Sequence, residues 1–310
     1  MTEKQTSLIA ERDEAALAQP CKVESYMHRS DWLRGTHQSI GASASSRIVG
    51  LSRYGSPYSE WVRFTEPLVI DEPDEMQRWG LLLEPVILAE FARQAGVRAE
   101  QPPPYTVHRS RERPYIHATL DAITDGGEPV ELKTAHFTQA KIWKTEVPLP
   151  YMVQVQHQIY VTGAKQGYIA VLVDGYQFAW HRVARHQKFI DRLLKRLDHF
   201  WHEYVEKRQP PPVDYSAATP ALLRLYPTAN GSCVDLPDDA ESLYDEMKTL
   251  TATEAAAKKR KEWIKNYVRE RMGENRYGRC ISGRGFQWAG ENGSRRFTLT
   301  ERCPDPTSHD

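Results

Sequence analysis

Residues 117–133 constrain the fold of this chain more than any other stretch, because they hold two β-like runs around a turn signal, Asp-Gly-Gly at 125–127. Glycine readily adopts the positive φ that a tight turn needs, so the stretch is predicted to form a β-hairpin. With the loop centred on its middle residue, Asp121 lies directly opposite Glu131. Side chains alternate between the faces of a strand, so Lys133 points the same way as Glu131.

This arrangement favours a particular chemistry. Cross-strand neighbours lie about 5 Å apart between Cβ atoms, and two carboxylates at that distance repel unless a cation lies between them. Hard oxygen ligands suit Mg²⁺ or Mn²⁺, and Lys133 beside the metal would hold an attacking water or stabilise charge on a phosphate. The pattern predicts a phosphodiesterase site. The alternative is a solvated face with a surface ion pair worth about 1 kcal/mol at most.

Composition limits the class of protein. The chain has 310 residues, 40% of them hydrophobic and 26% charged, which is ordinary for a soluble globular protein with one large domain or a domain plus an appendage. A polar N-terminus and the lack of a long apolar run predict neither a membrane span nor a secretory signal, so we expect a cytoplasmic protein. The net charge of zero argues against indiscriminate coating of nucleic acid, although a local basic groove remains compatible with it.

The cysteines give no sign of a metal or disulfide framework. Their spacing is too scattered for a zinc site, a disulfide scaffold or an iron–sulfur cluster, so we expect reduced thiols at the four positions Cys21, Cys233, Cys280 and Cys303.

An unusual carboxylate lies upstream of the hairpin. Residues 76–93 carry apolar side chains at helical spacing and are predicted to form a helix that ends near Gly96. Glu84 interrupts this apolar stretch, next to Pro85, and buried carboxylates are usually paired or bound to metal. The alternative is a partly exposed helix glutamate.

Two further segments are candidates for the same site. The hydroxyl-rich segment 39–46 predicts a helix start, which either is an ordinary N-cap or holds a phosphate with Arg29 or Arg34 nearby. Residues 151–163 predict a helix that places Gln154 and Gln158 on one face and Gln156 on another. Its glutamines either orient groups near a metal or form an ordinary polar face.

The remaining chain divides at the three prolines 210–212, which follow a basic amphipathic helix at 186–207. Beyond them, residues 241–272 predict a second long helix with a basic second half, and residues 277–301 predict a final hairpin. The basic run is either a solvated face or a surface for a phosphate backbone. We therefore expect four parts: a flexible arm at 1–25, a core at 26–209, an appendage at 210–303 and a disordered tail at 304–310.

Together these segments resemble the lambda-exonuclease-like, or YqaJ-type, viral recombinases of the PD-(D/E)xK nucleases. The resemblance spans residues 30–163 and rests on four blocks in order: Ser39-Ile40-Gly41-Ala42-Ser43; Trp79-Gly80 with Glu84; Asp121 with Glu131-Leu132-Lys133; and Tyr151-Met152-Val153-Gln154-Val155-Gln156 before Val161-Thr162-Gly163. Leu120 stands where the family has a proline, which contributes backbone shape and no ligand. The resemblance weakens after residue 210.

The resemblance implies an α/β fold with a restriction-endonuclease-like core, a central mixed sheet flanked by helices, and a C-terminal helix plus β-hairpin appendage. It implies a 5′ to 3′ exonuclease that digests one strand of linear double-stranded DNA and leaves 3′ overhangs. Such enzymes form ring-shaped homo-oligomers, a trimer being favoured here, and act with a single-strand annealing protein in a phage or prophage setting within a bacterial host.

The resemblance also assigns roles. Asp121, Glu131, Glu84 and the Leu132 backbone carbonyl would bind magnesium, for which manganese would substitute, with two ions per site, and Lys133 would activate water. Gln154 or Gln156 would orient the site, and the terminal 5′-phosphate would bind the set Ser43, Arg34 and Ser39. Two other readings stay open: an endonuclease of the same superfamily, and a non-catalytic scaffold that binds DNA ends. The appendage would seal the ring, grip the displaced strand or dock the annealing partner.

Overall fold

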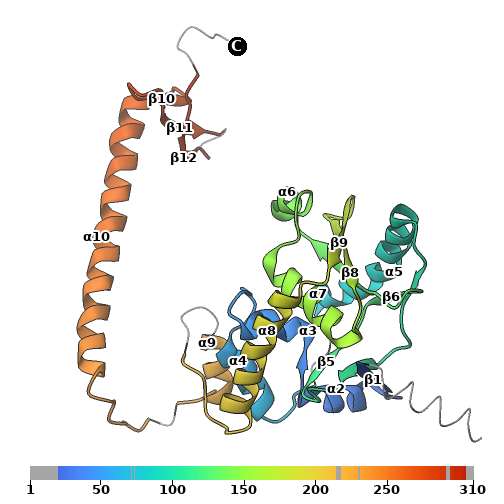
Figure 1. Ribbon diagram of the computed structural model, residues 1–310. Coiled ribbons are helices and arrows are strands. Elements are labelled where there is room, and N and C mark those ends of the chain that lie inside the picture. The colour runs from blue at the N-terminus through green and yellow to red at the C-terminus, as the bar shows by residue number, and fades with distance from the viewer. Residues whose placement is uncertain are drawn as a thin grey trace, which may run out of the picture. The chain divides into compact units, whose positions relative to one another are not determined.

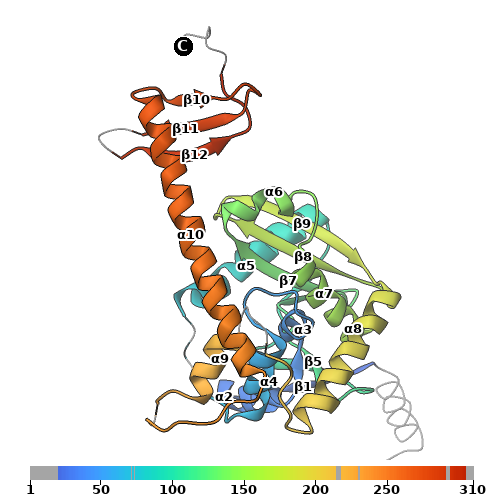
Figure 2. The same ribbon diagram turned by 90° about the vertical axis from the view of Figure 1, so that its left-hand side faces the viewer.

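The computed structural model describes residues 20–70, 72, 74–213, 218–229, 231–290 and 294–304. The chain forms two units, Met1–Ala229 and Asn230–Asp310, which are described separately. Figures 1 and 2 show the elements of each unit from two sides.

The first unit is built on a five-stranded mixed sheet with the order β3-β6-β7-β8-β9. Its strands are β3 (Ala99–Glu100), β6 (Ala122–Thr124), β7 (Pro129–Ala135), β8 (Gln166–Val173) and β9 (Gln177–Ala184). Only β7 and β8 pair in parallel, because α7 (Leu149–Thr162) crosses over between them, and the other pairs are antiparallel.

Helices cover both faces of this sheet. Ile169 and Val171 of β8 belong to the core that also contains Ile159 of α7 and residues of α8 (Gln187–His199). Tyr168 and Ala170, on the alternate face, pack with α5 (Glu75–Ala95). This is the expected mixed α/β architecture, a central mixed sheet flanked by helices, and the prediction of fold class is confirmed.

A second, four-stranded sheet has the order β1-β4-β5-β2. It consists of β1 (Cys21–Ser25), β4 (Thr106–Ser110), β5 (Ile116–Ala118) and β2 (Ile40–Gly41), and β2 pairs in parallel with β5. The chain passes from β5 in this sheet to β6 in the central sheet through residues 119–121. The predicted hairpin is therefore present as β6 and β7, but its first run is split between two sheets, and only Gly127 of the turn has a positive φ.

The other predicted elements of this unit are also present. The predicted helix at 76–93 is α5, which continues through Pro85 and ends at Gly96 with φ +65. The helix ending at Gly163 is α7. Beside it, β8 and β9 form a further hairpin around Asp174 and Gly175, both with positive φ. The helix at 186–207 is α8, which continues as a π-helical turn, η2 (Phe200–Val205).

The shorter helices complete the first unit: α2 (Arg29–His37), α3 (Ala42–Ile48), α4 (Pro57–Thr65), η1 (Phe137–Gln139), α6 (Ala140–Trp143) and α9 (Ala218–Leu225). The sequence places a boundary at residue 210, but α9 packs on α4 through Ala221, Tyr58 and Val62, and the two units divide after Ala229.

The expected ends of the chain fall partly outside the described residues. Residues 1–19 of the expected N-terminal arm and residues 305–310 of the expected tail lie there. Residues Cys21–Ser25 were expected to belong to the arm, but they form β1, which pairs antiparallel with β4. The backbone hydrogen bonds of this pairing fix these residues to the first unit.

The second unit consists of α10 (Ala240–Met272) and an antiparallel sheet of three strands, β10 (Tyr277–Arg279), β11 (Gly285–Ala289) and β12 (Arg296–Thr300) (Figures 1 and 2). The predicted long helix is present. The predicted hairpin is β11 and β12, and β10 adds a strand that was not expected. Across the residues that the structure describes, no helix is both long enough and apolar enough to cross a membrane.

Candidate active site

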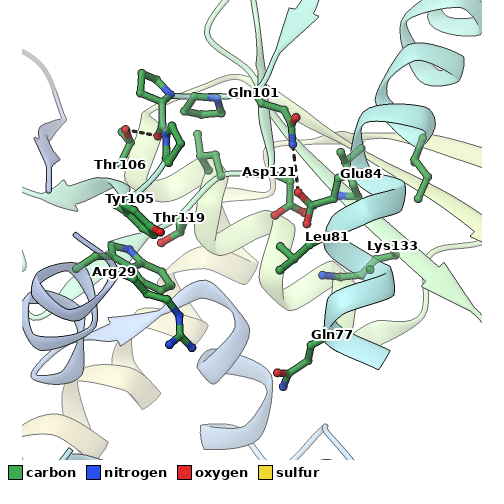
Figure 3. Close-up of a pocket in the computed structure, with 18 of the residues that line it drawn as sticks. Arg29, Gln77, Leu81, Glu84, Gln101, Tyr105, Thr106, Thr119, Asp121 and Lys133 are labelled. Carbon is green, nitrogen blue, oxygen red and sulfur yellow. Dashed lines mark hydrogen bonds between the residues drawn. The ribbon is translucent and has the colours of Figure 1, made fainter. Parts of the chain in front are cut away.

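A cleft of about 1070 Å³ opens on the first unit between α5 and residues 101–106 (Figure 3). Its floor is the point where the chain enters β6 and the exposed edge of β7. Three candidate site residues from the sequence, Glu84, Asp121 and Lys133, line the same cleft. Figure 3 shows Glu84 and Asp121 pointing toward one another from opposite walls.

The hairpin register brings Asp121 to the position that the sequence predicts. Ala122 pairs with Val130, so the next step along both strands sets Asp121 opposite Glu131. Because β6 has ended there, Leu132 has no β6 backbone partner, and its N–H donates to Asp121 Oδ2 at 2.8 Å. The aspartate thus takes the place of a strand at this edge of β7 and is held by the backbone.

Glu131 is buried, with 1% of its surface exposed, and receives three hydrogen bonds or ion pairs from neighbouring side chains. Lys133 Nζ and Gln154 Nε2 both donate to Oε1, and Gln158 Nε2 donates to Oε2. Gln154 and Gln158 lie one turn apart on α7, which packs behind β7. A buried carboxylate is costly without such partners, so α7 and Lys133 fix the position of Glu131.

Gln156, which the resemblance offers as an alternative to Gln154, lies outside this cluster. Its Nε2 donates to Ala184 O at 2.7 Å, and its Oε1 accepts from His186 N at 3.0 Å. Since α7 turns by 100° per residue, Gln156 points toward the link between β9 and α8. The sequence prediction that Gln156 orients the site is wrong for this arrangement, and Gln154 with Gln158 takes that place.

Glu84 approaches from α5 and is half-buried. Gln101 Nε2 donates to Glu84 Oε2 at 3.1 Å, and this bond appears as a dashed line in Figure 3. Burial raises the pKa of Glu84, and the charge of Glu131 raises it further. The second effect shows that Glu84 lies within the electrostatic field of the Glu131 carboxylate.

The cleft holds more negative charge than its lysine balances. Burial, together with the charges of Glu131 and Glu84, raises the pKa of Asp121 to about 8, although Lys133 and the Leu132 N–H act in the opposite direction. Burial lowers the pKa of Lys133, but Glu131 and Asp121 outweigh that effect and leave it above its ordinary value. A buried carboxyl group whose pKa is raised by burial and by neighbouring negative charges marks a place where a cation would be stabilised.

The donor chemistry fits a hard divalent cation. In the part of the chain that the structure describes, no three His, Cys, Asp or Glu side chains form a ready-made cluster for a metal. Asp121 and Glu84 line the cleft together with Leu132, and Glu131 is buried beside Lys133. This donor set suits magnesium, which commonly combines one or two carboxylates with water and phosphate oxygens.

The three candidate phosphate ligands differ in their exposure to solvent. Ser43 is exposed on α3, and Arg34 is exposed on α2, where it pairs with Asp31 at 3.0 Å. Ser39 is buried, and its Oγ lies 2.8 Å from His117 Nδ1. The prediction that Ser39 contacts a bound phosphate is therefore wrong, because its hydroxyl is enclosed and already has a partner.

Three contacting residues were missing from the predicted site: Gln158, Gln101 and Tyr151, whose ring centre lies 6.0 Å from Lys133 Nζ. Gln158 had a sequence signal, because it lies four residues after Gln154 on the same helix face. Tyr151 stands in the fourth sequence block but had no role assigned to it. Gln101 had no sequence signal, since its contact with Glu84 depends on how α5 packs against the sheet.

The similarity to known proteins spans the four sequence blocks. The model of the YqaJ-like viral recombinase domain matches residues 31–165. The uncharacterized protein YqaJ of Bacillus subtilis (strain 168) is 27% identical over 285 residues, which cover 90% of this chain and 85% of that protein.

Solved structures give more distant matches. An alkaline exonuclease from Laribacter hongkongensis in complex with dAMP matches with 16% identity and a TM-score of 0.48, over 58% of this chain and 94% of that chain. A phage related exonuclease from Haemophilus somnus 129PT matches with 14% identity and a TM-score of 0.42, over 55% and 95% respectively.

The family match covers most of α2 and every element from β2 through α7, and it contains the acidic side chains Glu84, Asp121 and Glu131 together with Lys133. The relative from Bacillus subtilis extends the likeness over most of the chain, the second unit included. The family model, this relative and the four sequence blocks agree with one another, and residues 31–165 of the chain match a YqaJ-like viral recombinase domain.

Proposed function

We propose that this protein is a magnesium-dependent deoxyribonuclease that digests one strand of linear double-stranded DNA from the 5′ end and leaves a 3′ single-stranded overhang. The observation that carries the proposal is the convergence of Asp121, Glu84 and Lys133 on one open cleft, with Glu131 buried against Lys133, where burial and the neighbouring negative charges raise the pKa of Asp121 to about 8. The match to the YqaJ-like viral recombinase domain supports a role in recombination.

Asp121, Glu131, Glu84 and the Leu132 carbonyl would hold the magnesium, with two ions per site and manganese as a substitute. When bound, such ions polarise a phosphodiester and lower the pKa of a water molecule. Gln154 and Gln158 hold the Glu131 carboxylate in position, and the Leu132 N–H holds Asp121. These contacts preorganise the acidic groups before any ligand arrives.

Lys133 has a separate task. It projects from the same face of β7 as Glu131 and pairs with that carboxylate, so its ammonium group lies at the cleft and stays charged. From there it donates a hydrogen bond to an attacking water, or to the phosphate as negative charge develops in the transition state.

The terminal 5′-phosphate would bind Ser43 with Arg34. Both are exposed, and Arg34 presently pairs with the half-exposed Asp31, a surface ion pair that a doubly charged phosphate can displace. Ser39 has no part in this contact. We further propose a ring-shaped homo-oligomer, most simply a trimer, that acts with a single-strand annealing protein in the cytoplasm of a bacterial host and is encoded by a phage or prophage.

The substrate distinguishes this function from its alternatives. Purified protein with magnesium should digest a linear duplex progressively and leave a covalently closed circular plasmid intact. Cleavage of the circle would instead identify an endonuclease of the same superfamily. Binding of duplex ends without hydrolysis in magnesium or manganese would identify a non-catalytic scaffold. A duplex labelled at either the 5′ or the 3′ end reports the direction, and early release of the 3′ label would contradict the proposed polarity.

A further inference from the structure

The second unit carries a row of cationic and aromatic side chains along one side of α10, which we call the α10 ladder: Arg260, Trp263, Tyr267 and Arg271. The rings of Trp263 and Tyr267 stack, with centroids 5.0 Å apart and planes at 22°. The guanidinium carbon of Arg260 lies 4.2 Å from the Trp263 ring centre, and that of Arg271 lies 3.5 Å from the Tyr267 ring centre. Spacings of three and four residues keep the ladder on one side of the helix.

Both rings of the ladder face solvent rather than a core. Trp263 is 50% exposed and Tyr267 is 43% exposed. In the same unit, by contrast, Trp288 and Phe297 are half-buried and enclose the Arg269 guanidinium. The sheet therefore uses its own aromatic side chains for folding, whereas the ladder presents its rings to the solvent, as binding surfaces do.

The charge around the ladder is strongly positive. Two glutamates, Glu262 and Glu270, interrupt a run of basic residues in the second half of α10 that consists of Lys258, Lys259, Arg260, Lys261, Lys265, Arg269 and Arg271. A basic helix with interleaved exposed aromatic rings has the two features that single-stranded nucleic acid requires, a counter-charge for the phosphates and flat surfaces for the bases.

We propose that the α10 ladder binds single-stranded nucleic acid, with bases stacked on Trp263 and Tyr267 and with the guanidinium groups of Arg260 and Arg271 on backbone phosphates. Arg260 now lies against the Trp263 ring and Arg271 against the Tyr267 ring. Because an exposed cation–π contact is weaker than the stacking of a base on the same ring, a base displaces the arginine. The displaced guanidinium group is then free to bind a phosphate. Duplex DNA keeps its bases stacked inside and offers these rings nothing to stack on.

The proposal depends only on residues of the second unit and not on hydrolysis at the cleft. If the proposed nuclease function is correct, the 3′ single strand that the reaction leaves is a ligand of the required chemistry. If that function fails, the ladder still predicts affinity for single strands, so the two proposals succeed or fail separately.

Fluorescence anisotropy of the full-length protein in EDTA, where no metal-dependent digestion takes place, tests the proposal. The ligands are labelled oligo-dT of about 20 nucleotides, longer than a typical stacking site, and a duplex of the same length. Trp263→Ala with Tyr267→Ala should weaken oligo-dT binding about tenfold or more and leave duplex binding within twofold. Trp263→Phe with Tyr267→Phe should restore most of the affinity, because both rings remain.

A matched control lies on the same helix. Leu243 and Met247 are exposed apolar side chains of α10 away from the ladder, at 57% and 66%, and their replacement by alanine should leave oligo-dT binding within twofold. Arg260→Ala with Arg271→Ala should lower the slope of log Kd against log salt by about 1.4, the value for two phosphate contacts on a single strand.

Three results would overturn the proposal. The first is an unchanged oligo-dT affinity of the double alanine variant while circular dichroism shows an intact helix. The second is a loss of duplex affinity as large as the loss of oligo-dT affinity, which would make this side of α10 a general phosphate contact. The third is a change in the oligomeric mass of the double alanine variant without a change in its DNA affinity, which would make the ladder a protein contact.

Discussion

At the scale of single residues, the cleft works by supplying donors to a carboxylate that water cannot reach. Glu131 has 1% of its surface exposed, and Lys133, Gln154 and Gln158 all donate to it. Removing one partner leaves a buried charge short of a hydrogen bond, which costs more than the bond itself contributes. The glutamines on α7 are therefore positioning residues that act through Glu131.

Replacing Gln158 by alanine should lower the free energy of unfolding by about 1–3 kcal/mol and raise the magnesium concentration needed for half-maximal activity. Gln156→Ala is the matched control, because Gln156 is also a buried glutamine of α7, but its hydrogen bonds go to backbone groups away from the cleft. It should cost similar stability in urea and leave the magnesium requirement unchanged. An unchanged magnesium titration for Gln158→Ala would show that the Gln158 contact is purely structural.

Ser43 and Ser39, the two serines of the first sequence block, should also respond differently to substitution. Ser43→Ala should slow digestion of a 5′-phosphorylated duplex toward the rate on a 5′-hydroxyl duplex, because the exposed hydroxyl is lost as a phosphate ligand. Ser39→Ala should leave the ratio of the two rates unchanged and only reduce stability, since its hydroxyl pairs with His117. Equal rates of the wild-type protein on both duplexes would contradict the proposed contact between Ser43 and the 5′-phosphate.

At the scale of elements, two buried histidines, His117 and His157, tie α3, β5 and α7 together. His157 Nδ1 lies 2.7 Å from Ser45 Oγ, its Nε2 lies 2.9 Å from the backbone oxygen of His117, and the His117 ring contacts Ser39. Burial lowers the pKa of His157 to about 4. Burial, with the charges of Arg109, His157 and Arg63, lowers the pKa of His117 to about 3.

This network makes stability depend on pH with a definite sign. Between about pH 6.5 and 4 the unfolded chain protonates these histidines and the folded chain does not, so stability is complete above pH 6.5 and falls as the pH decreases. Each histidine contributes a slope of about 1.4 kcal/mol per pH unit. Urea unfolding at several pH values measures it. His157→Gln should remove roughly one histidine's share of the slope, and an identical slope would contradict the assignment.

Periodicity predicts elements better than it predicts their partners. The register that sets Asp121 against Glu131 follows from the turn position and the two-residue period of a strand. The switch between sheets at residues 119–121 leaves no such trace, because a short apolar run reads the same in either sheet. For the same reason α9 could be predicted as a helix, whereas its packing on α4 could not.

At the scale of the whole molecule, the chain combines a unit with a cleft and a unit with a basic helix, and the sequence indicates both. The net charge of zero agrees with a protein whose basic groups are local, such as those of α10. The third strand of the second unit escaped prediction, because β10 is only three residues long and gives too short a pattern.

The proposed ring makes a simple prediction about mass. Light scattering of the full-length protein at micromolar concentration should give three times the protomer mass, because a closed ring satisfies every copy of a head-to-tail interface. A monomer over the whole concentration range would contradict the ring. Lys133→Ala should keep the wild-type mass, because its side chain lines the cleft.

The most direct test of the account is the rate at which Lys133→Ala digests a linear duplex in magnesium under single-turnover conditions. Lys141→Ala, the replacement of an exposed lysine on α6, serves as the control. Lys133→Ala should lose at least about a hundredfold in rate while keeping its duplex affinity, and the control should keep wild-type activity. Activity of Lys133→Ala within a few fold of the wild type would show that the cleft is not the site of hydrolysis.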